Sequence, residues 1–304
     1  MVTATYNKQG EMMETPWLDR TAYPFRHHTL EVDGGRMHYV DEGNGEPILF
    51  VHGSAAWSFV YRHLIHDLRQ DYRCVAPDHL GFGLSAKPAN WGYRLADHAR
   101  NLVALIDHLG LNHFTLVVHD VGGPIGLSYA LEHPERVARL LVLNTFCWSL
   151  RGPFALAPSP IAALLRGPIG RLFITQFNTE LRLLIPQVYG DRRKLTPAIY
   201  RQYLAPLATP EDRHGLFAFA EQVFSESDWC EELWEQREAL ARIPAAVAWG
   251  MRDPLFGQQF LARWREALPG AEVVTLPGAG HFVQEEAPAE VTQALRRLLA
   301  TVPA

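Results

Sequence analysis

Short runs of apolar and often β-branched residues alternate with amphipathic stretches through the first half of the chain. Such an alternation predicts a parallel sheet that is covered by helices. The run TLVVHD is apolar on both faces, which is typical of a central strand. A helix is predicted over 95–109, where apolar residues recur at helical spacing before Gly110. The predicted strands are 28–33, 36–41, 47–52, 72–77, 114–119 and 137–144.

The pattern changes after Asn144. Over 147–228 the sequence is helix-like, repeatedly interrupted by proline, and free of strands of comparable strength. We therefore expect one α/β domain whose core comprises 1–146 and 229–304, with 147–228 inserted as a helical cap. The cap is expected above the carboxyl edge of the sheet, where doubly wound sheets bind ligands. The elements predicted after it are a strand at 245–250, a helix at 257–267, a strand at 271–276 and an amphipathic helix at 288–300.

Charge and composition narrow the class of protein. A net charge of −5 over 304 residues leaves no basic surface for phosphates, so we expect neither nucleic acid nor an anionic membrane as a partner. The first 19 residues carry charges throughout and lack the apolar core of a signal peptide. Cys74, Cys147 and Cys230 form no CxxC pair and predict no disulfide framework. These features predict a cytoplasmic protein and leave its oligomeric state open.

The segment VVHDVGG carries Asp120 where a buried strand meets a helix. A residue at so sharp a turn projects from the sheet edge, and Gly122 and Gly123 allow the helix to pack closely. In hydrolases this strand-to-helix turn is called the nucleophile elbow, and it usually has serine at its centre. The nearest serine here, Ser128, falls inside the following helix. Asp120 is therefore the candidate nucleophile, and a plain helix N-cap is the alternative role.

Two later loops supply possible partners for Asp120. Asp253 follows the strand at 245–250, and His281 lies in a glycine-rich loop beyond the last strand. The chain order is thus nucleophile, acid, base, which is the order of the α/β-hydrolase architecture. The end of the strand at 137–144 could also have carried the acid, but it reads Asn144-Thr145-Phe146. Asp253 is therefore the candidate acid.

A third element is the His52-Gly53-Ser54 turn at the end of a predicted strand. In such enzymes this loop donates a backbone N–H to the oxyanion, so Ser54 and Val121 are the predicted oxyanion donors. The glycine turn that follows Asp78 is interpreted as structural. No HExxH motif and no complete dinucleotide-binding loop is present, so we expect neither a metal nor an organic cofactor.

The HG turn, DHLGFGLSAKP, VVHDVGG, WGMRDPLF and GAGHFVQEE together resemble the haloalkane dehalogenase family of α/β-hydrolases. The resemblance runs from about residue 27 to the C-terminus. It implies an α/β-hydrolase fold with a mostly parallel eight-stranded sheet, flanking helices and a helical cap after the sixth strand. It also implies a hydrolase acting on a small, mostly apolar organic substrate. Related families that share the aspartate elbow include epoxide hydrolases and β-lactone decarboxylases.

Two positions depart from the dehalogenase pattern. That family usually has tryptophan after the nucleophile and asparagine after the HG pair, and both hold the departing halide; here they are Val121 and Ser54. A halide leaving without these donors faces a higher barrier. Other aromatic residues could line the pocket. A tryptophan there could donate a hydrogen bond to the halide, and a cap tyrosine could act as the ring-opening acid of an epoxide hydrolase. These candidates are Trp57, Trp148, Trp229, Tyr189, Tyr200 and Tyr203.

The chemistry expected of an aspartate nucleophile is displacement at an sp³ carbon. The carboxylate is ionised at neutral pH and attacks without a base, giving a covalent ester. His281 then activates a water that hydrolyses the ester to an alcohol, while Asp253 orients the histidine. Dehalogenation ranks first on overall resemblance, and epoxide or strained-lactone hydrolysis or decarboxylation is the alternative. A non-catalytic protein that binds a small ligand is a third hypothesis, against which the full triad argues.

Overall fold

The computed structural model describes residues 15–155 and 167–301, which form an eight-stranded sheet of order β1-β2-β4-β3-β5-β6-β7-β8. Strand β2 pairs antiparallel with both β1 and β4, and all the remaining pairs are parallel. The predicted mostly parallel, eight-stranded sheet is therefore confirmed. The strands are β1 (His27–Val32), β2 (Gly35–Glu42), β3 (Pro47–Val51), β4 (Arg73–Pro77), β5 (Phe114–Asp120), β6 (Val137–Thr145), β7 (Ala245–Gly250) and β8 (Glu272–Leu276).

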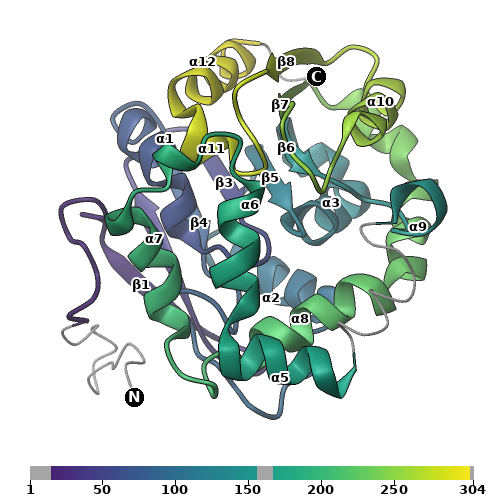
Figure 1. The fold of residues 1–304 in the computed structure, drawn as a ribbon. Coiled ribbons are helices and arrows are strands. Elements are labelled where there is room, and N and C mark those ends of the chain that lie inside the picture. The colour runs from purple at the N-terminus through teal and green to yellow at the C-terminus, as the bar shows by residue number, and fades with distance from the viewer. Residues whose placement is uncertain (1–14, 156–166, 302–304) are drawn as a thin grey trace.

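Helices cover the sheet from both sides (Figure 1). On one side α1 packs against α12, and on the other α2 packs against α3. The predicted final helix, 288–300, is confirmed as α12, and a short helix that the sequence did not predict, α11, precedes it. The helices of the core are η1 (Ser58–Tyr61), α1 (Arg62–Leu68), α2 (Leu95–His108), α3 (Gly122–Glu132), α9 (Ser227–Glu235), α10 (Gln258–Ala267), α11 (Val283–Glu286) and α12 (Pro288–Leu299).

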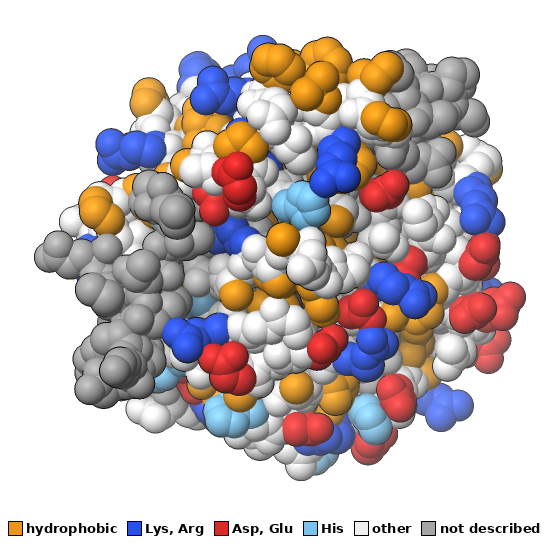
Figure 2. Space-filling model, turned by 90° about the horizontal axis from the view of Figure 1, so that it is seen from below, with side chains coloured by type: hydrophobic (Ala, Val, Ile, Leu, Met, Phe, Trp, Pro, Cys, Tyr) orange, Lys and Arg blue, Asp and Glu red, His pale blue; other side chains and the backbone are white. Residues whose placement is uncertain are grey.

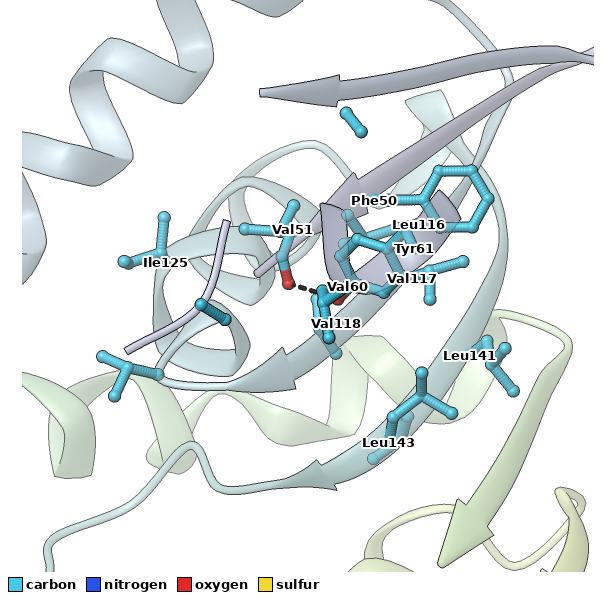
Figure 3. Packing of buried hydrophobic residues seen from close by; sticks show 14 of the residues in the cluster. Phe50, Val51, Val60, Tyr61, Leu116, Val117, Val118, Ile125, Leu141 and Leu143 are labelled. Atoms are coloured by element: carbon cyan, nitrogen blue, oxygen red, sulfur yellow. Dashed lines mark hydrogen bonds between the residues drawn. The ribbon is translucent and has the colours of Figure 1, made fainter. Parts of the chain in front are cut away.

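The centre of the sheet is fully enclosed. Every residue of β5 and of β6 is buried, as expected of parallel strands with helices on both faces. Figure 3 shows side chains of β3, β5 and β6 packed together with residues of the flanking helices. One of these, Tyr61, also donates a 2.8 Å hydrogen bond from its hydroxyl to the carbonyl of Val51. This packing holds the carboxyl ends of β3, β5 and β6 in fixed positions, and the residues of interest follow those ends.

Between β6 and β7 the described residues form helices, which lie across the lower and front part of the molecule in Figure 1. We call the stretch from 147 to 226 the insert. Residues 156–166 of the predicted cap and 1–14 of the predicted first core segment lie outside the described residues. The longer helical segments of the insert are α5 (Pro168–Phe177), the π-helical η4 (Glu180–Leu184), α6 (Ile185–Val188), α7 (Pro197–Leu204) and α8 (His214–Ser225).

The surface of the insert is unusually apolar around α5 and η4. Figure 2 shows acidic and basic side chains interspersed over one face of the molecule, with hydrophobic side chains gathered along one edge. Among the described residues, no helix combines the length and the apolarity needed to cross a membrane. Within residues 15–155 and 167–301, the large hydrophobic side chains that are exposed all belong to α5 or η4, namely Ile169, Leu172, Phe173, Phe177, Leu183 and Leu184.

Asp78 has the structural role that the sequence predicts for it. Its carboxylate accepts 2.8 Å hydrogen bonds from the backbone N–H groups of Ser58 and Leu84, and a 2.9 Å bond from Nδ1 of His38. Burial raises the pKa of Asp78, but His38 and the N–H donors outweigh it and lower the pKa to about 2. The ionised carboxylate therefore fixes the turn after β4 beside the loop that contains Ser54.

Candidate active site

Asp120 is the last residue of β5 and stands at the junction with α3. Its φ is +52°, a left-handed conformation that costs a non-glycine residue roughly 1–2 kcal/mol. Such conformations persist where the surrounding structure imposes them, often at functional sites. The N-cap residue of α3 is Val121, so Asp120 is not simply capping the helix. Its side chain instead lines a cavity to which residues of the insert also contribute.

His281 lies between the other two predicted members of the triad. Its Nδ1 is 2.9 Å from Oδ2 of Asp253, and its Nε2 is 4.0 Å from Oδ1 of Asp120. Since Asp253 accepts a hydrogen bond, Nδ1 carries the proton, and the unprotonated Nε2 faces Asp120. The backbone of His281 is held on both sides, because its N–H donates to Val188 and its carbonyl accepts from the ring of His119. The structure therefore brings the three predicted catalytic residues together.

Asp253 is fixed by donors from the core. Oδ2 accepts a 2.8 Å hydrogen bond from Nδ2 of Asn144, and Oδ1 accepts one of 2.8 Å from the N–H of Leu255. Burial raises the pKa of Asp253, but His281 and these hydrogen bonds outweigh it, so its pKa lies below the usual value. Asp253 is thus an ionised partner for His281. The sequence placed no function on Asn144, the penultimate residue of β6, which holds this acid.

The surroundings of the site shift the pKa of the candidate base, His281, and that of the candidate nucleophile, Asp120. Burial lowers the pKa of His281, but the carboxylates of Asp253 and Asp120 outweigh it and raise the pKa above 6.5. Burial raises the pKa of Asp120, and His281 and two backbone N–H groups offset only part of that effect. A carboxylate that is poorly solvated in this way is a stronger base and nucleophile than one in water.

The two predicted oxyanion donors both contact the Asp120 carboxylate. The N–H of Ser54 donates a 2.8 Å hydrogen bond to Oδ2, and the N–H of Val121 also bonds to the carboxylate and lowers its pKa. Gly53 makes this approach possible, because a Cβ at that position would overlap with the side chain of Asp120. The oxyanion that forms during hydrolysis of an Asp120 ester is the second carboxyl oxygen, so donors placed on Oδ2 are suitably positioned to stabilise it.

His52 holds the loop that contains Ser54. Its Nδ1 donates to the carbonyl of Gly53 at 2.8 Å, and its Nε2 accepts from the N–H of His79 at 2.9 Å. A neutral ring with one donor and one acceptor satisfies both bonds. Burial lowers the pKa of His52, which favours this neutral form. The loop donor is therefore fixed before any substrate binds.

A cavity of about 420 Å³ is lined by Asp120 and His281 together with residues of the core and of the insert. Its polar lining residues are Asp120, His281, Ser54 and Glu180, together with Thr179, Gln187 and Glu221 of the insert. Aliphatic and phenylalanine side chains from the core and from the insert form the rest. They include Val121, Phe146, Leu184, Val223, Phe256 and Phe282.

The six aromatic residues predicted for the pocket do not line this cavity. The indole N–H of Trp57 is taken by the carbonyl of Gln202 at 3.0 Å. Trp148 is buried against Trp234 and Trp264, and Trp229 packs partly buried against the hydrophobic core. Trp57 and Trp148 follow strands of the core and Trp229 lies in α9, and the sequence does not show which way each indole ring points.

The tyrosines of the insert likewise point elsewhere. Tyr200 donates to the carbonyl of Leu181 at 3.0 Å, and Tyr203 donates to the buried carboxylate of Glu285. Tyr189 packs against Phe282, with ring centroids 5.4 Å apart. None of the three is placed to protonate a group attached to Asp120. The prediction that they line the pocket is therefore corrected.

The sequence missed Glu180, a carboxyl group of the insert that does line the cavity. Its Oε1 accepts a 3.0 Å hydrogen bond from the hydroxyl of Ser54. Burial and the Asp120 carboxylate raise the pKa of Glu180 to about 7, although the Ser54 hydrogen bond opposes them. Glu180 is the first residue of η4, a short π-helical segment. Such segments are rare in proteins, and those that occur are often found at functional sites.

Comparison with known proteins agrees with this geometry. A family model described as the alpha/beta hydrolase fold matches residues 46–288. A cis-3-alkyl-4-alkyloxetan-2-one decarboxylase of Shewanella oneidensis is 34% identical, covering 92% of this chain and 90% of the relative. Haloalkane dehalogenase 2 of Mycobacterium bovis is 35% identical, covering 91% of this chain and 96% of the relative.

Solved structures give the same result. A loop variant of a haloalkane dehalogenase from Bradyrhizobium elkanii superimposes with a TM-score of 0.81 at 25% identity, covering 91% of this chain and 97% of that one. A haloalkane dehalogenase from Agrobacterium tumefaciens superimposes with a TM-score of 0.80 at 29% identity, covering 90% and 96%. The resemblance noted in the sequence is thus confirmed. The chain belongs to the α/β-hydrolase family and, within it, to the group that contains the haloalkane dehalogenases and the alkyl-oxetanone decarboxylases.

Proposed function

We propose that this hydrolase opens small, mostly apolar organic substrates by attack of the Asp120 carboxylate on an sp³ carbon that bears a leaving group. The observation that carries the proposal is the position of Asp120. It is held at the strand-to-helix turn, its Oδ2 accepts from Ser54, its Oδ1 lies 4.0 Å from Nε2 of His281, and both residues line the cavity. Attack by Oδ1 gives an ester between Asp120 and the substrate carbon.

The second half of the reaction hydrolyses this ester. Nε2 of His281 takes a proton from a water molecule, and the hydroxide attacks the carbonyl carbon of the ester. The N–H groups of Ser54 and Val121 stabilise the resulting oxyanion. Asp253 accepts from Nδ1 at 2.9 Å and stabilises the cationic ring. Collapse of the tetrahedral intermediate releases the alcohol and restores Asp120.

The lining of the cavity supports a small apolar substrate. A volume of about 420 Å³ suits a compact organic molecule, and most of the lining side chains are apolar. Leu183 and Leu184 both line the cavity and are exposed, so its entrance is apolar as well. Relatives about 35% identical carry the names haloalkane dehalogenase and cis-3-alkyl-4-alkyloxetan-2-one decarboxylase, and both names denote substrates of this kind.

The three cysteines are buried as free thiols. Burial raises the pKa of Cys74 and of Cys230 to about 12, so both remain protonated. We propose on this basis a reducing, cytoplasmic location for the protein, as the sequence suggests. Fractionation of cells that express the full chain would contradict the proposal if the protein were recovered outside the cytoplasmic fraction.

The nucleophile is tested with a His281→Phe variant, in which the ester forms but is not hydrolysed. The variant is incubated with a bromoalkane, an epoxide and a β-lactone of matched chain length, and its intact mass is measured. We expect a stoichiometric mass increase with at least one compound, located on Asp120 by peptide mapping. If no compound adds mass and the wild type turns none over, the proposed enzymatic function is wrong and binding of a small ligand becomes the better hypothesis.

Two variants serve as controls. Asp120→Asn in the His281→Phe background should remove the adduct, because a neutral amide is a far weaker nucleophile. His66 is an exposed histidine of α1, so His66→Phe should turn substrate over at the wild-type rate without accumulating ester. An adduct that survives the Asp120→Asn change would place the nucleophile elsewhere.

A further inference from the structure

Ser54 links the candidate nucleophile to a second carboxyl group. Its backbone N–H donates to Oδ2 of Asp120 at 2.8 Å, and its hydroxyl donates to Oε1 of Glu180 at 3.0 Å. Both carboxyl groups line the same cavity. Asp120 lines that cavity from the sheet edge and Glu180 from the insert, so a molecule attacked by Asp120 occupies a cavity that Glu180 also lines.

Glu180 is able to hold a proton in this position. Burial and the neighbouring Asp120 carboxylate raise its pKa to about 7, so a large fraction of it is protonated at neutral pH. A general acid works best when its pKa lies near the operating pH. Asp120 must be ionised to attack, so one carboxyl is a nucleophile and the other a proton donor. Active sites in which the surroundings give two carboxyl groups different pKa values often divide the roles in this way.

The leaving group determines whether a proton donor is needed. A halide is a very weak base and departs as an anion. A carboxylate released from a lactone is also a weak base, since its conjugate acid has a pKa of about 4. An alkoxide is a strong base, because the pKa of its conjugate acid is near that of water, about 15.7. Only the alkoxide requires protonation as its bond to carbon breaks.

Other donors within the cavity are poorly suited to this task. Val121 has no donor on its side chain, and the Ser54 hydroxyl is directed to Glu180. The tyrosines of the insert are bonded or packed elsewhere. Glu221 also lines the cavity, but Ser54 connects only Glu180 to the nucleophile.

We propose that Glu180 is a catalytic acid that protonates the oxygen of a strained ring while Asp120 attacks the adjacent carbon, so that the preferred substrates are apolar epoxides. The proposal rests on the proposed role of Asp120 as nucleophile and names the substrate class of that site.

The proposed step balances as follows. A lone pair on Oδ1 of Asp120 forms the bond to the ring carbon, and the electron pair of the ring C–O bond moves to oxygen. That oxygen takes the proton of the Glu180 carboxyl, which leaves a β-hydroxyalkyl ester on Asp120 and a carboxylate on Glu180. Water activated by His281 then hydrolyses the ester to a diol. The proton carried by His281 returns to Glu180 through solvent, so one epoxide and one water give one diol.

The test measures ester formation alone, in the His281→Phe background, by intact mass in a single turnover. Each protein is given a terminal epoxide or a bromoalkane of the same chain length. Glu180→Gln keeps an oxygen that accepts from Ser54 but has no acidic proton. We expect this change to slow labelling by the epoxide by about 10²–10⁴-fold, the usual contribution of a general acid, and to leave labelling by the bromoalkane unchanged within error.

Glu221→Gln is the matched control, since it removes another carboxyl group of the cavity. The ratio of epoxide to bromoalkane labelling should stay at its starting value in this variant. Circular dichroism and the melting temperature establish that each variant is folded. Glu180→Asp keeps an acidic proton on a shorter side chain, and it should recover part of the epoxide rate.

A pH profile separates proton donation from substrate positioning. With Glu180 present, labelling by the epoxide should fall as the pH rises through about 7, because the acid form is lost. This alkaline decrease should be absent in Glu180→Gln and absent for the bromoalkane.

Each remaining outcome has a definite meaning. If the bromoalkane labels Asp120 and the epoxide does not, the nucleophile stands and the role of Glu180 is overturned. The same holds if Glu180→Gln slows both compounds equally, or if Glu221→Gln lowers the ratio instead. If no compound labels Asp120, the proposed function and this inference fail together.

Discussion

Nδ2 of Asn144 lies 2.8 Å from Oδ2 of Asp253, the oxygen that also accepts from His281. The other end of the Asn144 amide accepts a 2.8 Å hydrogen bond from the N–H of Gly250. Asn144 thus ties the end of β6 to the end of β7 and to the acid that follows it. An uncharged residue at the end of β6 sets the orientation of a charged one after β7.

Removing this amide should affect both stability and catalysis. Asn144→Ala leaves the buried N–H of Gly250 without its acceptor, so we expect the free energy of unfolding to fall by about 1–3 kcal/mol. It also removes a donor that lowers the pKa of Asp253, which weakens the hold on His281 and slows ester hydrolysis. Denaturant unfolding and turnover measure the two effects. Asn101 donates to Asp33 far from the site, so Asn101→Ala should lose comparable stability and keep its kcat.

Replacing Asp253 should separate the two half-reactions. In Asp253→Asn the histidine loses its anionic partner and its fixed tautomer, whereas attack by Asp120 needs neither. We expect hydrolysis of the ester to slow on the order of 10³–10⁴-fold, comparable with the loss in serine hydrolase triads, while ester formation continues. Intact mass under turnover conditions should then show accumulated ester. An enzyme that slows without accumulating ester would contradict the assigned role of Asp253.

The pH dependence of ester hydrolysis should reflect His281. The base must be neutral, and the carboxylate of Asp253 raises its pKa, whereas Asp120 is uncharged while it is esterified. The hydrolysis rate should therefore fall as the pH drops through that raised pKa and level off at higher pH. In Asp253→Asn the largest raising influence is absent, so the acid limb should move to lower pH. Single-turnover decay of the ester, followed from pH 5 to pH 9, checks both expectations.

Ser54 should tune the proposed acid. Its hydroxyl lowers the pKa of Glu180, so Ser54→Ala should raise that pKa further. The alkaline limb of epoxide labelling should then move to higher pH, whereas labelling by a bromoalkane should show no corresponding shift. The backbone N–H that contacts Asp120 is retained in this variant. If the alkaline limb of epoxide labelling does not move in Ser54→Ala, Glu180 does not determine that limb.

The elbow should be intolerant of any side chain at Gly122. A Cβ there would overlap with the backbone carbonyl of Val51 and approach that of His52, so α3 would have to move away from β3. We expect Gly122→Ala to reduce the free energy of unfolding by about 1–3 kcal/mol, the usual cost of overpacking, and to displace Asp120. Gly270 has open space around its Cα, so Gly270→Ala should change stability by less than about 0.5 kcal/mol. Thermal denaturation of both variants provides the comparison.

Most of the core could be predicted from the sequence, because the signals that specify it are local. The apolar runs of β5 and β6 read directly as strands buried on both faces. Asp120, Asp253 and His281 each follow a strand, and the carboxyl ends of parallel strands meet at one edge of the sheet. Their convergence therefore follows from chain order and topology alone.

The insert could not be read in the same way. Which face of each helix turns toward Asp120 depends on packing between segments that share no periodic signal with the core. The sequence thus favoured Tyr200 and Tyr203, whose hydroxyl groups are bonded to Leu181 and Glu285. Glu180 was passed over because a single carboxyl in a helix-like stretch is indistinguishable from a solvated one until its contact with Ser54 is known.

Glu180 comes from the insert, whereas Asp120, His281 and both oxyanion donors belong to the core. The part of the reaction that selects which bond is opened is therefore encoded by a different stretch of the chain from the part that hydrolyses the ester. The two parts touch through one serine hydroxyl. Exchange of the insert between relatives would then transfer the preference for a leaving group, whereas the core residues that hydrolyse the ester would stay the same.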